Sequence, residues 1–248
     1  MSRLISLLAG LVFLAPTAPA QDLEPIAVAV GLSIPPYVIA DERRGMEYDI
    51  VRDALADAGY DMEPVFMDLG AVPEALARGE VDAAMTVSPD ANPGAALSEV
   101  AIVYHNQAMT LAEHNITIDT IEDLADHSIM AFQNARLYLP DPYRAIADGN
   151  PAYSEVAEQY RQNLALFTGE VEVVVADINI FNWFTDDPRV TSMADTRQPV
   201  TRHAIFPPTS YRVGFRDEAT RDAFDVALAA LRASGRYDAI IESYGGTP

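Results

Sequence analysis

The chain has 248 residues, half of them hydrophobic, with a formal net charge of −21, which excludes global disorder and disfavours nucleic acid as a partner. It has no cysteine, so disulfides and thiolate zinc sites are excluded. The four histidines are scattered and never stand four residues apart, so we expect neither a metal site nor a cofactor.

The first 20 residues have the pattern of a secretory signal peptide. Arg3 precedes a short apolar run from Leu4 to Leu14, and Ala18 and Ala20 supply the small residues of a cleavage site. The apolar run is too short to span a bilayer stably, and no later stretch reaches that length. We expect cleavage near Ala20–Gln21 and a monomeric periplasmic protein without stable membrane insertion.

Short apolar runs alternate with amphipathic stretches from Ile26 onward. Ile26 to Leu32 predicts a buried strand, and the prolines that follow leave Tyr37 near its carboxyl end, where open α/β sheets bind ligands. Tyr37 is therefore a candidate ligand contact, with a half-buried packing role as the alternative. The spacing next predicts a helix that stops at Gly59, a strand from Met62 to Met67, and a helix from Asp68 to Gly79.

Two stretches 90 residues apart repeat one another: Arg78 to Val87 and Thr168 to Asp177. Each follows a stretch of helical spacing, places a glycine where a helix C-cap belongs, and continues as a short apolar strand. Two α/β lobes, each with its own sheet, are the natural interpretation. A single doubly wound domain with similar neighbouring units is the alternative.

The first repeat runs into a loop rich in small polar residues. Thr86 and Ser88 open this loop, and their hydroxyls can hydrogen-bond a polar ligand; ordinary turn chemistry is the alternative. Later segments are predicted as follows: extended runs at 101–104 and 107–111, a short helix near 120, a strand at 128–132, an amphipathic helix at 153–167, a helix or turn at 178–184, strands at 200–206 and 211–215, and helices at 219–233 and 236–244.

The order of these segments resembles the type II periplasmic binding proteins, in particular the polar amino acid family (family 3) of ABC-transporter solute-binding proteins. The resemblance covers nearly all of the mature chain. Its matching pieces are Gly31 to Tyr37, Gly45 to Asp49, Pro73 to Thr86, Glu122 to Gln133, Gly169 to Asp177, Tyr211 to Phe215 and Ala227 to Tyr244.

This resemblance implies a two-lobe α/β fold with discontinuous lobes. Residues 21–108 and 206–248 would form lobe 1, residues 109–205 would form lobe 2, and two connecting strands would form the hinge. A small polar ligand would bind between the lobes, and an inner-membrane ABC permease would recognise the closed state.

The family's ligand contacts carry over unevenly. Asp177 stands where amino acid binders hold the ligand's α-ammonium group; a helix N-cap is the alternative role. The family's first-lobe Arg, which clamps the ligand's carboxylate, is absent from residues 86–98. Where the family has Gln-Gly-Ser/Thr-Thr, this chain has Gln133-Asn-Ala-Arg136, so Arg136 is a candidate replacement clamp; a surface Arg paired with Asp141 is the alternative.

The side-chain pocket also departs from the family pattern. Leu69 stands where an aromatic platform is expected, which suggests a different pocket or one completed by Tyr37, Tyr104 or Trp183. The resemblance thus implies a binding protein rather than an enzyme, for an amino acid or a related amine. The alternatives are a periplasmic dehydratase on the same fold, or the ligand-binding module of a sensor system.

Overall fold

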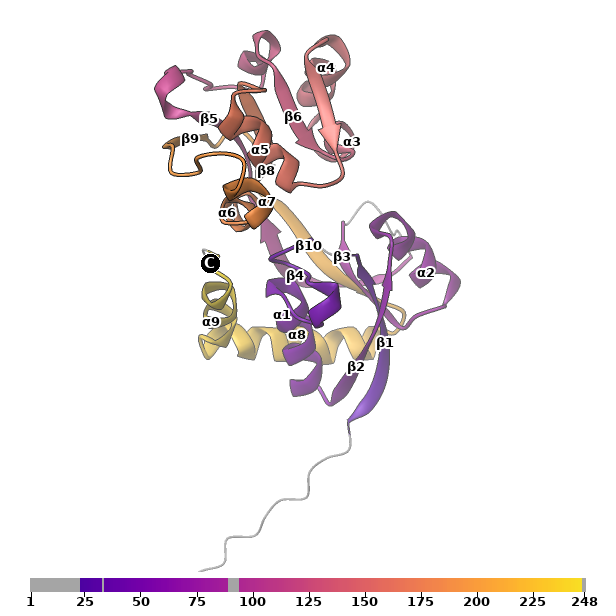
Figure 1. Cartoon of the computed structure of the whole chain (residues 1–248). Helices are drawn as coiled ribbons and strands as arrows, with labels where there is room; N and C mark the ends of the chain where they lie inside the picture. Colours follow the sequence, from indigo (N-terminus) through magenta and orange to yellow (C-terminus); the bar gives the residue numbers. More distant parts are fainter. Residues whose placement is uncertain (1–22, 33, 89–93, 247–248) are drawn as a thin grey trace, which may run out of the picture.

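The computed structural model describes residues 23–32, 34–88 and 94–246. These residues form two lobes, each built on a five-stranded sheet (Figure 1). No helix in the described ranges is long and apolar enough to cross a bilayer. The signal peptide expected over residues 1–20 lies outside the described residues.

The first sheet has the strand order β2-β1-β3-β10-β4. Strands β1, β2 and β3 are parallel, whereas β10 runs antiparallel to both of its neighbours. Helices α1, α8 and α9 pack together on one face, and α2 packs on the other. The bounds are β1 (Glu24–Gly31), α1 (Met46–Asp57), β2 (Tyr60–Met67), α2 (Val72–Arg78), β3 (Ala83–Val87), β4 (Ala96–Tyr104), β10 (Thr209–Phe215), α8 (Glu218–Ala233) and α9 (Arg236–Ser243).

The second sheet has the strand order β7-β6-β8-β5-β9, with β6, β7 and β8 parallel and β5 antiparallel to β8. Its central strand β8 is entirely buried, as expected of a continuous apolar run. The bounds are β5 (Asn106–Leu111), β6 (Ile129–Phe132), α3 (Ala135–Tyr138), α4 (Asp141–Gly149), β7 (Tyr153–Val156), α5 (Tyr160–Thr168), β8 (Val173–Asp177), α6 (Ile178–Thr185), α7 (Pro188–Thr191) and β9 (Val200–His203).

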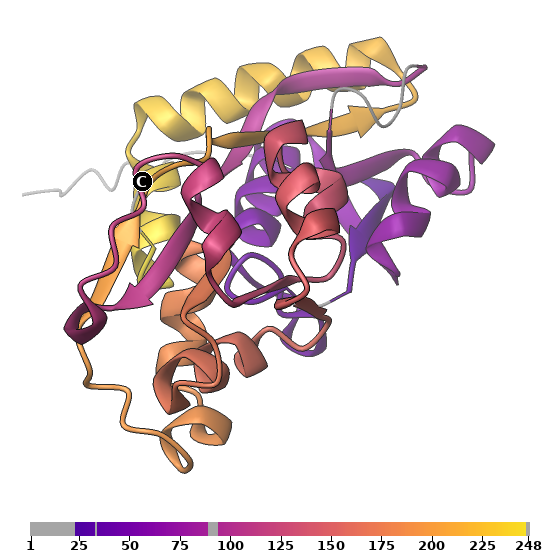
Figure 2. The same cartoon turned by 90° about the horizontal axis from the view of Figure 1, so that it is seen from above.

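Two segments connect the lobes, as Figures 1 and 2 show from two sides. The first is His105 alone, between β4 and β5, and the second is residues 204–208, between β9 and β10. Because β5 pairs with β8 and β9, the limit expected at 108/109 falls inside a strand of the second sheet. We therefore propose His105 and residues 204–208 as the hinge.

The repeated helix–Gly–strand pattern is confirmed. Gly79 ends α2 at φ 72° and Gly169 ends α5 at φ 75°, both in the left-handed region that glycine adopts cheaply. The strands that follow, β3 and β8, lie in different sheets, so the two-lobe interpretation is right and the single doubly wound domain is wrong.

The helix predicted over 153–167 is wrong in its first part. Residues 153–156 form β7, an edge strand that pairs in parallel with β6, and helix α5 begins only at Tyr160. Their sequence, Tyr-Ser-Glu-Val, does not alternate between apolar and polar residues as a strand with one buried face would, and all four are half-buried in the structure. Pairing with β6, rather than local sequence preference, determines their conformation.

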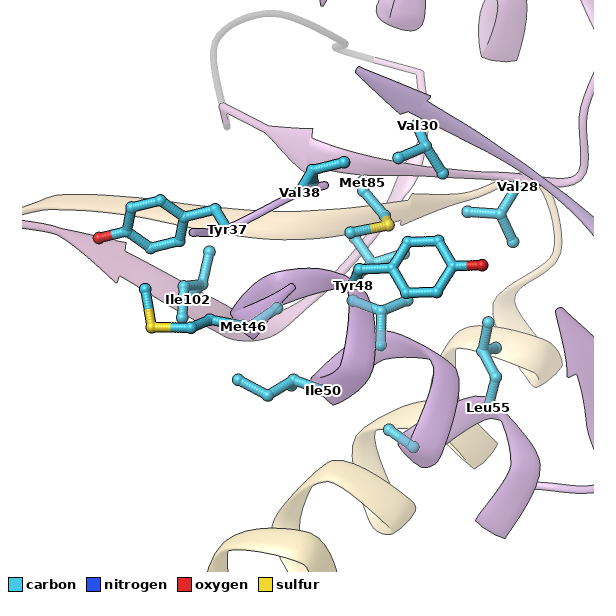
Figure 3. Close-up of a cluster of buried hydrophobic side chains, with 14 of the residues drawn as sticks. Val28, Val30, Tyr37, Val38, Met46, Tyr48, Ile50, Leu55, Met85 and Ile102 are labelled. Carbon is cyan, nitrogen blue, oxygen red and sulfur yellow. The ribbon is translucent and has the colours of Figure 1, made fainter. Parts of the chain in front are cut away.

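Helix α6 of the second lobe packs directly against the first lobe. Ile180 and Phe184 belong to the same buried cluster as the first-lobe core, and Trp183 packs on that cluster while partly buried. Figure 3 shows the first-lobe part of this cluster, with the hydroxyl of Tyr37 pointing away from the other labelled side chains. The lobes are therefore in contact along α6.

Gly45 allows α1 to begin close beneath the Tyr37 loop. It has φ 140°, and a Cβ added there would overlap with the carbonyl of Tyr37. Gly59 also has a positive φ, 97°, but an added Cβ would meet no atom within 4 Å.

We expect Gly59→Ala to cost about 1–2 kcal/mol of unfolding free energy, because of its φ alone. Gly45→Ala should cost about 1–3 kcal/mol more, because the Tyr37 loop must also move. Urea denaturation of both variants measures the difference. Equal losses would show that the loop accommodates a side chain at Gly45 without displacement.

Candidate functional site

The start of helix α1 holds the Tyr37 loop. The backbone N–H of Met46 donates to the carbonyl of Pro36 at 2.8 Å, and that of Glu47 donates to the carbonyl of Tyr37 at 3.1 Å. Helix N-termini have free N–H groups, and here the loop's carbonyls accept from them. Tyr37 is completely buried.

Asp177, the last residue of β8, is 1% exposed and binds elements from both lobes. Its Oδ1 caps helix α6 by accepting from the N–H groups of Asn179 (2.9 Å) and Ile180 (3.1 Å), and its Oδ2 accepts from the N–H of His105 (2.7 Å). The hydroxyl of Tyr37, from the first lobe, donates to Oδ1 at 3.1 Å. The N-cap role considered from the sequence is therefore real, and an interlobe hydrogen bond accompanies it.

Burial raises the pKa of Asp177 above its ordinary value, and the hydrogen bonds from Ile180, His105 and Tyr37 offset only part of that effect. The pKa of the Tyr37 phenol is raised as well, by burial first and then by the charge of Asp177. The amide Nδ2 of Asn179 donates to the Tyr37 hydroxyl at 3.0 Å. Tyr37 thus lies between an acceptor and a donor that both come from the second lobe.

A second buried carboxylate, Glu47, lies in the first turn of α1 and is 0% exposed. It accepts from Thr86 Oγ1 at 2.9 Å and from the Tyr104 hydroxyl at 3.2 Å. Burial raises the pKa of Glu47 from 4.5 to about 7, although the hydrogen bonds from Thr86 and Tyr104 oppose that shift.

Thr86 reaches Glu47 through a bulge in β3. Arg212 of β10 pairs with Val87 and Gly214 pairs with Ala84, so one residue of β10 faces two residues of β3. Thr86 has φ 57°, which is uncommon for a β-branched residue and costs on the order of 1–3 kcal/mol. Such strain collects at functional sites, which supports the candidate role of Thr86.

Three tyrosines, Tyr37, Tyr104 and Tyr211, form a tyrosine cluster between the two carboxylates. The rings of Tyr37 and Tyr104 stack at 3.8 Å with 17° between their planes, and Tyr211 meets Tyr104 edge-on at 4.9 Å. Tyr104 donates to Glu47 and Tyr37 donates to Asp177, so the stacked pair connects one acid to the other.

The other residues proposed from the sequence lie outside this group. Leu69 packs over Gly31 at the end of β1, half-buried, and Ser88 follows β3, also half-buried. Gln133 and Arg136 are exposed around the turn into α3. The Arg136 guanidinium lies 3.8 Å from Asp148 rather than pairing with Asp141, which pairs instead with Arg144.

Sequence reasoning gave Glu47, Tyr211 and Asn179 no place in the site. A signal for Glu47 was present, because it lies three and four residues before Ile50 and Val51, on the apolar face of α1. A charged residue on a buried helix face usually has a specific role. The described residues contain no group of His, Asp and Glu side chains suited to hold a metal ion.

A family model for bacterial extracellular solute-binding proteins, family 3, matches residues 26–247. The chain belongs to this family. None of the curated proteins matches it in sequence.

Solved structures with the same fold include an ancestral arginine-binding protein bound to glutamine, at 19% identity and TM-score 0.66, covering 90% of this chain and 98% of that one. A histidine kinase sensor domain similar to periplasmic binding proteins matches at 16% identity and TM-score 0.69 (92% and 99% covered). The GluR0 ligand-binding core in complex with L-glutamate matches at 16% identity and TM-score 0.68, covering 92% of this chain and 99% of that one. The fold is therefore the type II periplasmic binding protein fold.

Because the pKa of Glu47 is higher in the folded protein than in the unfolded chain, its burial is best tolerated below about pH 4.5 and becomes costly as pH rises to about 7. Relative to Glu47→Gln, the wild-type protein should lose about 2.5 kcal/mol of unfolding free energy between about pH 5 and pH 8. Urea denaturation across this range measures the effect. Glu63→Gln, at an exposed glutamate, is the control, and a parallel pH response of the Glu47→Gln and wild-type proteins would contradict the expectation.

Proposed function

We propose that the protein captures a small polar ligand with an ammonium group, an amino acid or a related amine, between its lobes and delivers it to an inner-membrane ABC importer. It would act in the periplasm as a monomer, after export through its signal peptide. Binding without catalysis is the role we propose, in keeping with a family of solute-binding proteins.

The observation that carries this proposal is the set of donors around Asp177. A carboxylate offers roughly four acceptor positions. Three donors are backbone N–H groups of the second lobe and its hinge, and the fourth is the Tyr37 hydroxyl of the first lobe. Separation of the lobes therefore removes one donor from Asp177 and leaves the cap of α6 in place.

A ligand ammonium group is a suitable replacement for that donor. It brings N–H groups and a positive charge to a buried carboxylate, and charge-assisted hydrogen bonds of this kind are stronger than neutral ones. Asp177 can then serve both as the cap of α6 and as the ligand anchor, two roles that the sequence presented as alternatives. Ligand binding would shift the lobes between open and closed states through its contacts with both.

The second candidate is the ligand-binding module of a sensor system. A histidine kinase sensor domain shares the fold at similar coverage, which supports this candidate without separating it from transport. A pull-down from membranes with ligand-loaded protein distinguishes them, since an importer and a sensor kinase are different partners. A dehydratase on this fold would instead turn over prephenate or arogenate.

Asp177→Asn tests the anchor, because Asn caps helices as well as Asp but carries no charge. We expect ammonium-bearing ligands from a panel of amino acids and amines to bind about tenfold to a hundredfold more weakly, since a hydrogen bond to a charged group contributes about 1.5–3 kcal/mol. Calorimetric titration of the folded variant measures the loss.

The matched control is Asp217→Asn. Asp217 caps α8 by accepting from the N–H of Thr220 and lies in the first lobe, away from the tyrosine cluster. The Asp217→Asn variant should bind the same ligands with the affinity of the wild-type protein. Unchanged affinity in Asp177→Asn would mean that Asp177 serves only as a cap.

A further inference from the structure

The two buried carboxylates beside the tyrosine cluster have no cationic partner. Within the described residues, no ion pair involves Glu47 or Asp177, and hydrogen bonds from neutral groups are all that they accept. Burial of a carboxylate is costly unless a positive charge compensates it. This region of the protein therefore favours a cation over an anion.

Three arginines of the described chain, Arg136, Arg202 and Arg212, are engaged elsewhere. Arg212, the one on β10 beside Val87, donates to the carbonyl of Ser98 and lies 3.9 Å from Glu99. Arg136 lies by Asp148, and Arg202 donates to Asn182 at 2.9 Å. No hydrogen bond or ion pair joins any described arginine to Glu47, Asp177 or Thr86, so a ligand carboxylate placed beside these acids would meet repulsion and no compensating guanidinium.

Each lobe supplies a tyrosine whose ring is at least partly exposed. Tyr211 is half-buried on β10, and Tyr138, on α3 of the second lobe, is 55% exposed. Tyr211 meets Tyr104 edge-on at 4.9 Å, and its pKa is raised to about 12, by burial first and then by Glu47, Tyr138 and Asp177. Ring faces of tyrosine attract organic cations, the more strongly when water is excluded.

We propose that the ligand is a primary amine that lacks a carboxylate, anchored by Asp177 and held against the rings of the tyrosine cluster. This inference rests on the proposed function and narrows its ligand class. On lobe opening the ammonium group replaces the Tyr37 hydroxyl at Asp177.

The experiment compares amines with the amino acids that differ from them only by the α-carboxylate. The pairs are cadaverine with L-lysine, putrescine with L-ornithine and tyramine with L-tyrosine, each titrated calorimetrically into the purified protein. We expect at least one amine to bind, and to bind about tenfold or more tightly than its amino acid, a difference of about 1.4 kcal/mol.

If an amino acid binds as tightly as its amine or more tightly, the inference is overturned while the proposed function stands. If no amine and no amino acid of the three pairs binds, both this inference and the proposed function are overturned. These two failures are therefore distinguishable in one set of titrations.

Variants at Tyr211 test the aromatic contact separately. Tyr211→Leu removes the ring and Tyr211→Phe keeps it, so affinity for the amine should fall more in the Leu variant than in the Phe variant. Circular dichroism verifies that both variants are folded. Equal losses would show that the hydroxyl or the packing of Tyr211, and not its ring face, matters, and would remove the tyrosine rings from the proposal.

Discussion

The hydrogen bond between Tyr37 and Asp177 connects the two lobes at a buried point. Elements of both lobes hold these two residues in position. On one side, the N-terminus of α1 holds the loop that carries Tyr37. On the other, β8 ends at Asp177, which caps α6, and α6 in turn packs Ile180 and Phe184 against the first lobe. A neutral hydroxyl on a buried carboxylate is a modest interaction, so a charged ligand competes with it readily.

Strain and uncompensated charge occur together in this region. Thr86 adopts a left-handed backbone conformation, and Glu47 and Asp177 are buried without a counter-charge. Each feature costs stability, and the packing of α1, α8 and the first sheet has to offset that cost. Features that lower stability in the same place usually reflect a requirement of function rather than of folding.

Much of the fold could be predicted from the sequence because its signals are local. Gly79 and Gly169 mark helix ends, because a helix often ends in a left-handed conformation that glycine adopts at little cost. The apolar runs after them predict buried strands. Residues 153–156 could not be assigned in this way, because pairing with β6 holds them extended. For the candidate site, the resemblance pointed to Asp177, and the strand end and the small polar loop pointed to Tyr37 and Thr86. The position of Arg136 beside Asp148 depends instead on how α3 and α4 pack.

Strand β10 lies between β3 and β4, although it follows them by more than 100 residues in the chain. Without residues 209–215, β3 and β4 have no partner on their facing edges, and α8 and α9 are not yet available to cover the sheet. The second lobe is continuous from Asn106 to His203, so all of its strands are available before β10 has been synthesised. We expect the first lobe to complete its folding last, since its contacts are the more distant in sequence, and the chain to remain partly unfolded until its C-terminal strand and helices have emerged.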